Sequence, residues 1–156
     1  IYSFEPVKQN FERLNKNGKI NNLENIKTYN LALSNIKKKV ELWVPDKFKT
    51  GGFSILNKNE EELKKYNIDE TFKTNSESEL VDNIINFVGK KIAVKMDVER
   101  HEEEVLEGMN KTIDRNYLIL QVEIFDERKD KVLNFLNKKK FRFLKNIKKD
   151  YFFKNF

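Results

Sequence analysis

The sequence predicts an α/β fold whose sheet is mostly parallel and ends in an antiparallel hairpin. Strand-like runs alternate with amphipathic helical segments through most of the chain, which is typical of βαβ units and a parallel sheet. Residues 141–156, FRFLKNIKKDYFFKNF, instead form two strand-like runs joined by a turn near residues 148–150. No repeat or linker divides the 156 residues, so we expect a single domain over residues 1–156.

The individual elements follow from the spacing of apolar residues. A strand in IYSFEP stops at Pro6, and Val7, Phe11 and Leu14 then recur at helical spacing. Further strands are expected in the runs NIKTYNLAL (25–33), KKVELWV (38–44), KIAVKMD (91–97) and YLILQVEI (117–124). Further helices are expected at 102–114 and 127–139, with weaker helical character near 60–66 and 77–87. Gly51-Gly52 indicates a loop and fits no phosphate-binding motif.

Composition limits the chemistry that the chain can perform. It has no cysteine and one histidine, which excludes thiolate sites and histidine-cluster metal sites. The net charge of +6 is modest, and we do not expect nucleic acid as a partner. No apolar run approaches the roughly 18 residues that would cross a bilayer, and we expect a cytoplasmic protein without a membrane span.

Three carboxylates fall at or near the carboxyl ends of predicted strands. They are Glu5, Asp97 and Glu123. In an open α/β sheet, ligands bind outside these strand ends. If the three strands are parallel neighbours in one sheet, the carboxylates face the same crevice.

Lys95 lies two residues before Asp97, so both side chains point to one face of the sheet. A parallel strand is usually covered on both faces, and a buried ammonium costs several kcal/mol unless it is paired. We therefore expect Lys95 to pair with a carboxylate. A structural ion pair and a functional cluster are equally consistent with these residues.

The segment after this strand also carries His101 and three successive glutamates from Glu102 to Glu104. A lone histidine at a helix start is more often a surface residue than a catalyst. Acidic residues in a first helical turn suit the helix dipole, by about 0.3–1 kcal/mol each. Glu99 has no such explanation, because it precedes that turn.

Several segments occur here in the order and approximate spacing of the FkbM-type methyltransferases. They are IYSFEPVKQNFERLNKN, NLALSN, GGFSIL, VKMDVERHEEEVLEGM and LILQVEI. The most specific piece is KMDVERHE, which is close to the family's Lys-Ile-Asp-Val-Glu-Gly-His-Glu. The chain resembles this family from Ile1 to the closing hairpin.

The resemblance implies a Rossmann-like sheet that binds S-adenosylmethionine and methylates the hydroxyl of a small molecule or sugar. Glu5 would hold the ribose hydroxyls, Ala32 and Leu33 would pack the adenine, and Asp97 would lie beneath the methionine moiety and the transferred methyl. The chain begins at what would be the second strand, so we expect the first strand and its glycine-rich turn to be missing from residues 1–156. That turn cradles the amino-acid end of the cofactor, and its loss should weaken cofactor binding.

On the acceptor side, the resemblance implies Lys95, Glu99, His101 and Glu102. A base must remove the hydroxyl proton, for which His101 is the first candidate and Asp97 the second. A Mg²⁺ held by Asp97, Glu99 and Glu123 is a possible alternative. We rank it below the version without a metal.

Two further departures from the family pattern bear on function. Arg100 stands where the family has a glycine, and an arginine there would cost roughly 1 kcal/mol if the position requires a positive φ. TNSESEL stands where a TLD stretch is expected. A degenerate, non-catalytic binding module is therefore the alternative to an enzyme. A nucleic-acid-binding domain, suggested by the basic C-terminal part, is the third hypothesis.

Overall fold

The structure is a computed structural model of the chain, and it describes residues 1–44 and 72–156. The predicted loop at Gly51-Gly52 and the helical character near 60–66 lie outside the described residues. The chain divides into two compact units, Ile1–Glu79 and Leu80–Phe156. A single domain over residues 1–156 stays a prediction. Within the described ranges, no helix combines the length and the apolar character that crossing a bilayer requires.

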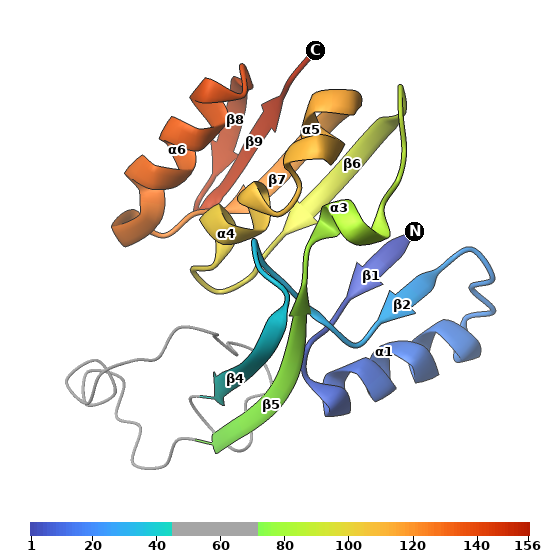
Figure 1. Cartoon of the computed structure of the whole chain (residues 1–156). Helices are drawn as coiled ribbons and strands as arrows, with labels where there is room; N and C mark the ends of the chain where they lie inside the picture. Colours follow the sequence, from blue (N-terminus) through green and yellow to red (C-terminus); the bar gives the residue numbers. More distant parts are fainter. Residues whose placement is uncertain (45–71) are drawn as a thin grey trace. The chain divides into compact units, whose positions relative to one another are not determined.

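The first unit holds two small sheets and one long helix. Its described elements are β1 (Tyr2–Phe4), α1 (Lys8–Ile20), β2 (Lys27–Tyr29), β3 (Ala32–Leu33), β4 (Lys38–Val44) and β5 (Phe72–Glu79). The strands β1 and β2 pair in parallel, and α1 lies alongside them (Figure 1). The strand β5 pairs in parallel with β3 and antiparallel with β4.

The first strand and helix form as the sequence predicts. β1 ends before Pro6, and the N–H of Val7, which caps α1, donates to Glu5 Oε1 at 2.8 Å. The predicted strand 25–33 is interrupted after β2. There the side chain of Asn30 donates to the carbonyl oxygens of Glu5 (2.8 Å) and Pro6 (3.1 Å), which fixes the chain between β2 and β3.

The helix expected near 77–87 is wrong over its first part, because β5 extends to Glu79. Side chains from Lys73 to Ser78 alternate between more and less exposed positions, which is the two-residue period of a strand. Ser78 is buried, donates to the carbonyl oxygen of Ile36 at 2.7 Å and accepts from the N–H of Lys38 at 3.2 Å. These bonds satisfy the buried Ser78 hydroxyl, and they depend on the strand conformation of β5.

The second unit is built on a four-stranded sheet with the order β6-β7-β9-β8. Its elements are α3 (Val81–Ile84), β6 (Lys91–Met96), α4 (Glu102–Glu107), α5 (Asn110–Arg115), β7 (Tyr117–Glu123), η1 (Asp126–Arg128), α6 (Lys129–Lys138), β8 (Arg142–Ile147) and β9 (Asp150–Lys154). β6 and β7 are parallel, and β9 runs antiparallel to both of its neighbours. The predicted C-terminal hairpin is confirmed, with a register shift between Phe143 and Lys145 in β8.

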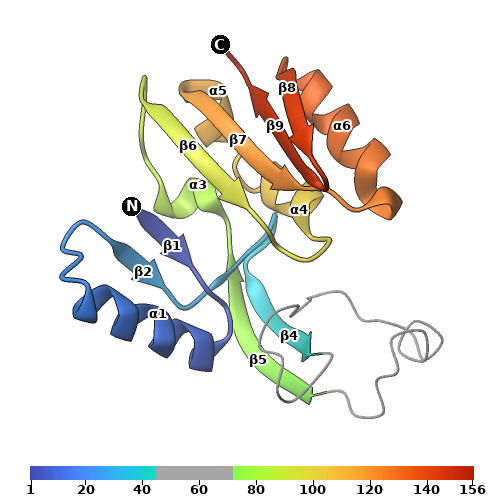
Figure 2. The same cartoon turned by 180° about the vertical axis from the view of Figure 1, so that it is seen from behind.

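One face of this sheet carries the core of the second unit. The helices α4, α5 and α6 lie on that face in Figure 1, and Figure 2 shows the sheet from the other side. In β7, Leu118, Leu120 and Val122 are fully buried and alternate with more exposed residues. The predicted helical stripe is also buried, and burying each large aliphatic side chain contributes about 1.5–3 kcal/mol. Its members are Val105, Leu106, Met109 and Ile113.

The fold is therefore mixed α/β, as the sequence predicts, with a parallel pair and a closing hairpin. The described strands do not form the expected single sheet, because hydrogen bonds join them into three sheets. Two of these sheets contain both parallel and antiparallel pairs. The complete Rossmann-like arrangement stays a prediction.

The helix expected over 102–114 is two helices, because the chain turns at Gly108 and Met109. Asp82, in α3, supplies the acceptors for the start of α5. Its carboxylate accepts the N–H of Lys111 and the N–H of Thr112, each at 2.8 Å, and the Thr112 hydroxyl at 2.7 Å. A capping carboxylate from a separate element thus starts the second helix.

We expect Asp82→Ala to lower the free energy of unfolding by about 2 kcal/mol, because two helix-start amides and a hydroxyl lose their acceptor. Urea denaturation measures the change, and hydrogen exchange should speed up at the Lys111 and Thr112 amides. Asp114→Ala is the control, since it removes only an exposed pair with Lys139 and should cost under about 1 kcal/mol. Equal losses in the two variants would contradict the capping role.

Candidate functional site

The candidate site lies where the parallel strands β6 and β7 end together. Lys95 is opposite Gln121 and Met96 is opposite Val122, so Asp97 directly follows β6 at the edge where Glu123 ends β7. Asp150, at the start of β9, pairs with Glu123 from the other side. The pairing of these strands gathers carboxylates at one edge of the sheet.

The neighbouring carboxylates affect the pKa of Glu123. Desolvation is the largest cause that raises the pKa of Glu123. A hydrogen bond with Asp97 and repulsion from Asp97, Glu99 and Asp150 raise it further. Glu123 therefore keeps a proton to higher pH than an ordinary glutamate, and it can share that proton with Asp97.

Lys95 is paired as expected, but it is not buried. Its Nζ lies 3.0 Å from Asp97 Oδ2, with 61% and 45% of the two side chains exposed. The expectation that both faces of this strand are covered is wrong for this side chain, because α4, α5 and α6 pack on the opposite face of the sheet. An exposed pair of this kind contributes little to stability, about 0–1 kcal/mol.

The loop between β6 and α4 has a left-handed backbone at two successive residues. Glu99 has a φ of 51° and Arg100 a φ of 74°. Arg100, which stands where the family has a glycine, thus has the positive φ that glycine favours. The Arg100 guanidinium stacks on the Phe125 ring, 4.3 Å from its centroid, and lies 3.9 Å from Glu127 Oε1.

His101 occupies the N-cap position of α4, and its side chain is almost fully buried, with 8% exposed. Its Nδ1 lies 3.5 Å from Glu104 Oε2, and Glu104 Oε1 lies 3.6 Å from Arg128 Nη1. The histidine is therefore part of a charged cluster with the start of α6. It is not the surface residue that its position in the sequence favoured.

The burial of Glu102 could not be predicted from the sequence. It is fully buried, and its Oε1 accepts the backbone N–H of Arg100 at 3.1 Å. Desolvation is the main cause that raises its pKa to about 7; backbone amides at residues 98, 100 and 102 oppose this, and Glu123 adds to it. Three successive glutamates look alike in the sequence, and only packing decides which of them is buried.

The residues predicted to hold a cofactor's ribose and adenine belong to the first unit. Glu5 directly follows β1, and burial raises its pKa while the N–H of Val7 and the side chain of Asn10 act against this. Ala32 is buried in a core cluster with Val7, Val40 and Leu42. Leu33, beside it in β3, is partly exposed.

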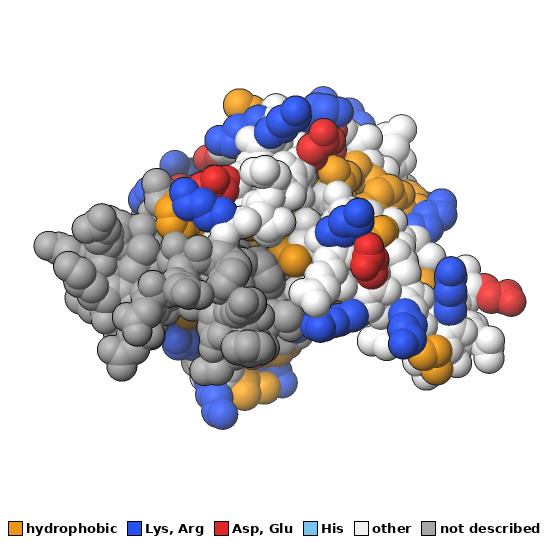
Figure 3. Space-filling model, turned by 90° about the horizontal axis from the view of Figure 1, so that it is seen from below, with side chains coloured by type: hydrophobic (Ala, Val, Ile, Leu, Met, Phe, Trp, Pro, Cys, Tyr) orange, Lys and Arg blue, Asp and Glu red, His pale blue; other side chains and the backbone are white. Residues whose placement is uncertain are grey.

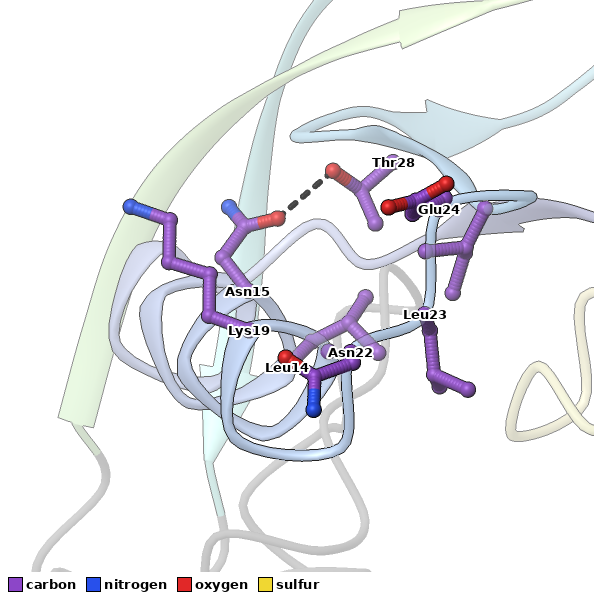
Figure 4. Close-up of a pocket in the computed structure, with 9 residues that line it drawn as sticks. Leu14, Asn15, Lys19, Asn22, Leu23, Glu24 and Thr28 are labelled. Carbon is purple, nitrogen blue, oxygen red and sulfur yellow. Dashed lines mark hydrogen bonds between the residues drawn. The ribbon is translucent and has the colours of Figure 1, made fainter.

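A hollow of about 340 Å³ also lies in the first unit, between α1 and residues 22–28 (Figure 4). Leu14, Leu23 and Ile26 give it apolar walls, and the Thr28 hydroxyl donates to Asn15 Oδ1 at 2.6 Å. No predicted site residue lines it.

Figure 3 shows Lys and Arg side chains at several places on one face of the molecule, with Asp and Glu among them.

The described carboxylates and histidine do not form a metal-binding cluster. In residues 1–44 and 72–156, no three or more Asp, Glu or His side chains are grouped so that they could hold a metal ion. The Mg²⁺ alternative at Asp97, Glu99 and Glu123 therefore lacks a ligand cluster in the described residues.

The model of the methyltransferase FkbM domain matches residues 1–143. The chain belongs to the FkbM methyltransferase family. The match includes every predicted site residue in both units. Comparison with curated proteins and with solved structures gives no match. The family supports methyltransferase activity in general, and within this FkbM domain the carboxylates at the ends of β6 and β7 are the best candidates for a functional site.

Two substitutions at Arg100 separate its backbone conformation from its side-chain contacts. Arg100→Gly and Arg100→Ala both remove the Phe125 stack and the Glu127 contact, but only glycine relieves the positive φ. We expect the Gly variant to unfold with a free energy about 1 kcal/mol higher than the Ala variant. In α4, Glu103→Gly should instead be less stable than Glu103→Ala, by roughly 0.5–1 kcal/mol. The same order at both positions would contradict a left-handed Arg100.

The raised pKa of Glu102 predicts a stability that falls with rising pH. The unfolded carboxyl ionises near pH 4.5 and the folded one near pH 7, so the folded state binds more protons between these values. Relative to Glu102→Gln, the wild-type free energy of unfolding should drop by about 3 kcal/mol across this window and stay level above it. Urea denaturation of both proteins from pH 4.5 to 8 measures the difference. A constant difference would show that Glu102 is ionised throughout.

Proposed function

We propose that this FkbM domain transfers a methyl group from S-adenosylmethionine to the hydroxyl of a small molecule or sugar. The observation that carries the proposal is the group of Asp97, Glu99 and Glu123 at the carboxyl ends of the parallel pair β6 and β7, where α/β sheets bind their ligands. These residues lie inside the matched part of the chain.

The residues of the first unit suit the polar and apolar parts of this cofactor. A carboxylate can accept hydrogen bonds from two vicinal hydroxyls, and Glu5 stands at the carboxyl end of β1, as a ribose-binding acid does. Of the two adenine candidates, Leu33 is the better one. Ala32 is already enclosed by the core of its own unit, whereas Leu33 keeps part of its surface.

The chemistry requires little more than positioning and a place for one proton. S-adenosylmethionine, when bound, would supply an electrophilic methyl group on a sulfonium sulfur, and the sulfur would be the leaving group, as a thioether. The chain must hold the acceptor oxygen about 3 Å from the methyl carbon, in line with the leaving sulfur. A base must also take the hydroxyl proton, which contributes typically 10²–10⁴-fold.

Asp97 is better placed than His101 to meet an acceptor. Nearly half of the Asp97 side chain is exposed, whereas His101 is buried against Glu104. Lys95 orients the Asp97 carboxylate through their 3.0 Å pair. Glu123, whose pKa is raised beside Asp97, can take over the proton that Asp97 receives when Glu123 is itself ionised. We therefore place Asp97 as the group that orients and deprotonates the acceptor, and His101 in support of the loop.

Two substitutions test the proposed roles in the full-length protein. Asp97→Asn keeps the shape of the side chain but removes its charge, so turnover at saturation should fall roughly 100-fold or more while the Kd for S-adenosylmethionine changes little. Glu5→Gln should instead raise that Kd, with a smaller effect on saturated turnover, because its role is at the ribose. Methyl-transfer assays and calorimetry measure the two effects.

Asp114→Asn is the matched control, because Asp114 is exposed and paired only to Lys139 in the contacts described above. It should leave turnover and cofactor affinity unchanged. If Asp97→Asn and Glu5→Gln lose only stability, with activity per folded molecule intact, the carboxylates are structural. Cofactor binding without turnover on any hydroxyl acceptor would instead favour the non-catalytic binding module.

A further inference from the structure

The loop between β6 and α4 has a conformation that its own residues do not favour. Glu99 and Arg100 are both left-handed, and neither is glycine. A non-glycine residue in this conformation is strained and persists only where the surrounding structure enforces it. The stack of Arg100 on Phe125 holds the guanidinium group. This stack involves the Arg100 side chain and not its left-handed backbone.

Glu102 contacts that backbone directly. Its Oε1 accepts the Arg100 N–H at 3.1 Å from a fully buried position in the first turn of α4. The helix beneath it is fixed by the buried side chains of Val105 and Leu106. A carboxyl oxygen can accept this N–H in both the protonated and the ionised form, so the bond does not depend on the charge of Glu102. It ties the left-handed peptide to a fixed helix and can thereby hold the turn.

The helix dipole alone does not explain Glu102. Glu103 occupies the same first turn, but its carboxylate lies 3.7 Å from both Arg128 Nη1, in η1, and Lys131 Nζ, in α6. Glu104 contacts His101 and Arg128. Of the three glutamates, Glu102 is the one that is fully buried and reaches back to the loop backbone.

We propose that Glu102 is a positioning residue: it holds the left-handed turn at Glu99 and Arg100, and through this turn keeps Asp97 and Glu99 beside Glu123. The inference rests on the proposed methyl transfer for its effect on turnover, but not for its effect on the loop. Glu102 thus acts on the acceptor site through the loop and does not contact the acceptor itself.

The test compares four variants of the full-length protein. Glu102→Ala should lose protection of the Arg100 amide from hydrogen exchange and lower kcat at least tenfold per folded molecule, with less than a threefold change in the Kd for S-adenosylmethionine. Glu102→Gln keeps an acceptor for the amide and should stay within threefold of wild type in both measurements. Glu103→Ala, the matched control, should match wild type. Adding Arg100→Gly to Glu102→Ala should restore part of kcat, because glycine relieves the strain at one of the two left-handed residues.

Three results would overturn the inference. They are an unchanged Arg100 amide in Glu102→Ala, a loss of turnover in Glu102→Gln equal to that in Glu102→Ala, and no recovery in the double variant. The amide measurement needs no activity, so it separates this inference from the proposed function. A wild-type protein that lacks methyl transfer but loses Arg100 protection in Glu102→Ala would refute the proposed function and leave the loop-holding role intact.

Discussion

The parallel pairing of β6 with β7 is the constraint on which the candidate site depends. It brings the residue after one strand and the last residue of the other to the same edge of the sheet, so that Asp97 helps to raise the pKa of Glu123. The helices that cover one face of this pair bury Leu120 and Val122 and leave Lys95 on the other face. A slip of one residue between the strands would exchange these faces and disperse the carboxylates.

Much of this arrangement could be predicted because it follows from period and position. The two-residue spacing of Lys95 and Asp97 predicts their pairing, and strand ends predict where carboxylates gather. Sequence reasoning failed where packing decides. It predicted no strand at β5 and expected helical character over its last residues, 77–79, because the strand's side chains are polar and its apolar period is weak. It also expected cover on both faces of β6, which depends on where the helices pack and not on the strand itself.

In the loop between β6 and α4, the sequence predicts the backbone conformation but not the contacts that stabilise it. Arg100, in a position where the family has glycine, pointed to a strained backbone, and the positive φ is present. What compensates for it could not be deduced. The Phe125 ring lies more than twenty residues away, and the acceptor for the Arg100 amide comes from one of three identical neighbours. Both contacts exist only once the chain has folded.

The position of β8 at the edge of the second unit's sheet offers an explanation for the basic C-terminal segment that does not involve nucleic acid. β8 has a hydrogen-bonded neighbour on one side only among the described strands, and all its side chains are exposed. Such an edge can pair with the same edge of another molecule and start aggregation. Arg142 and Lys145 place positive charges along it, and the register shift at Leu144 breaks its regularity. Like charges on two approaching copies repel, so these residues oppose the pairing of two such edges.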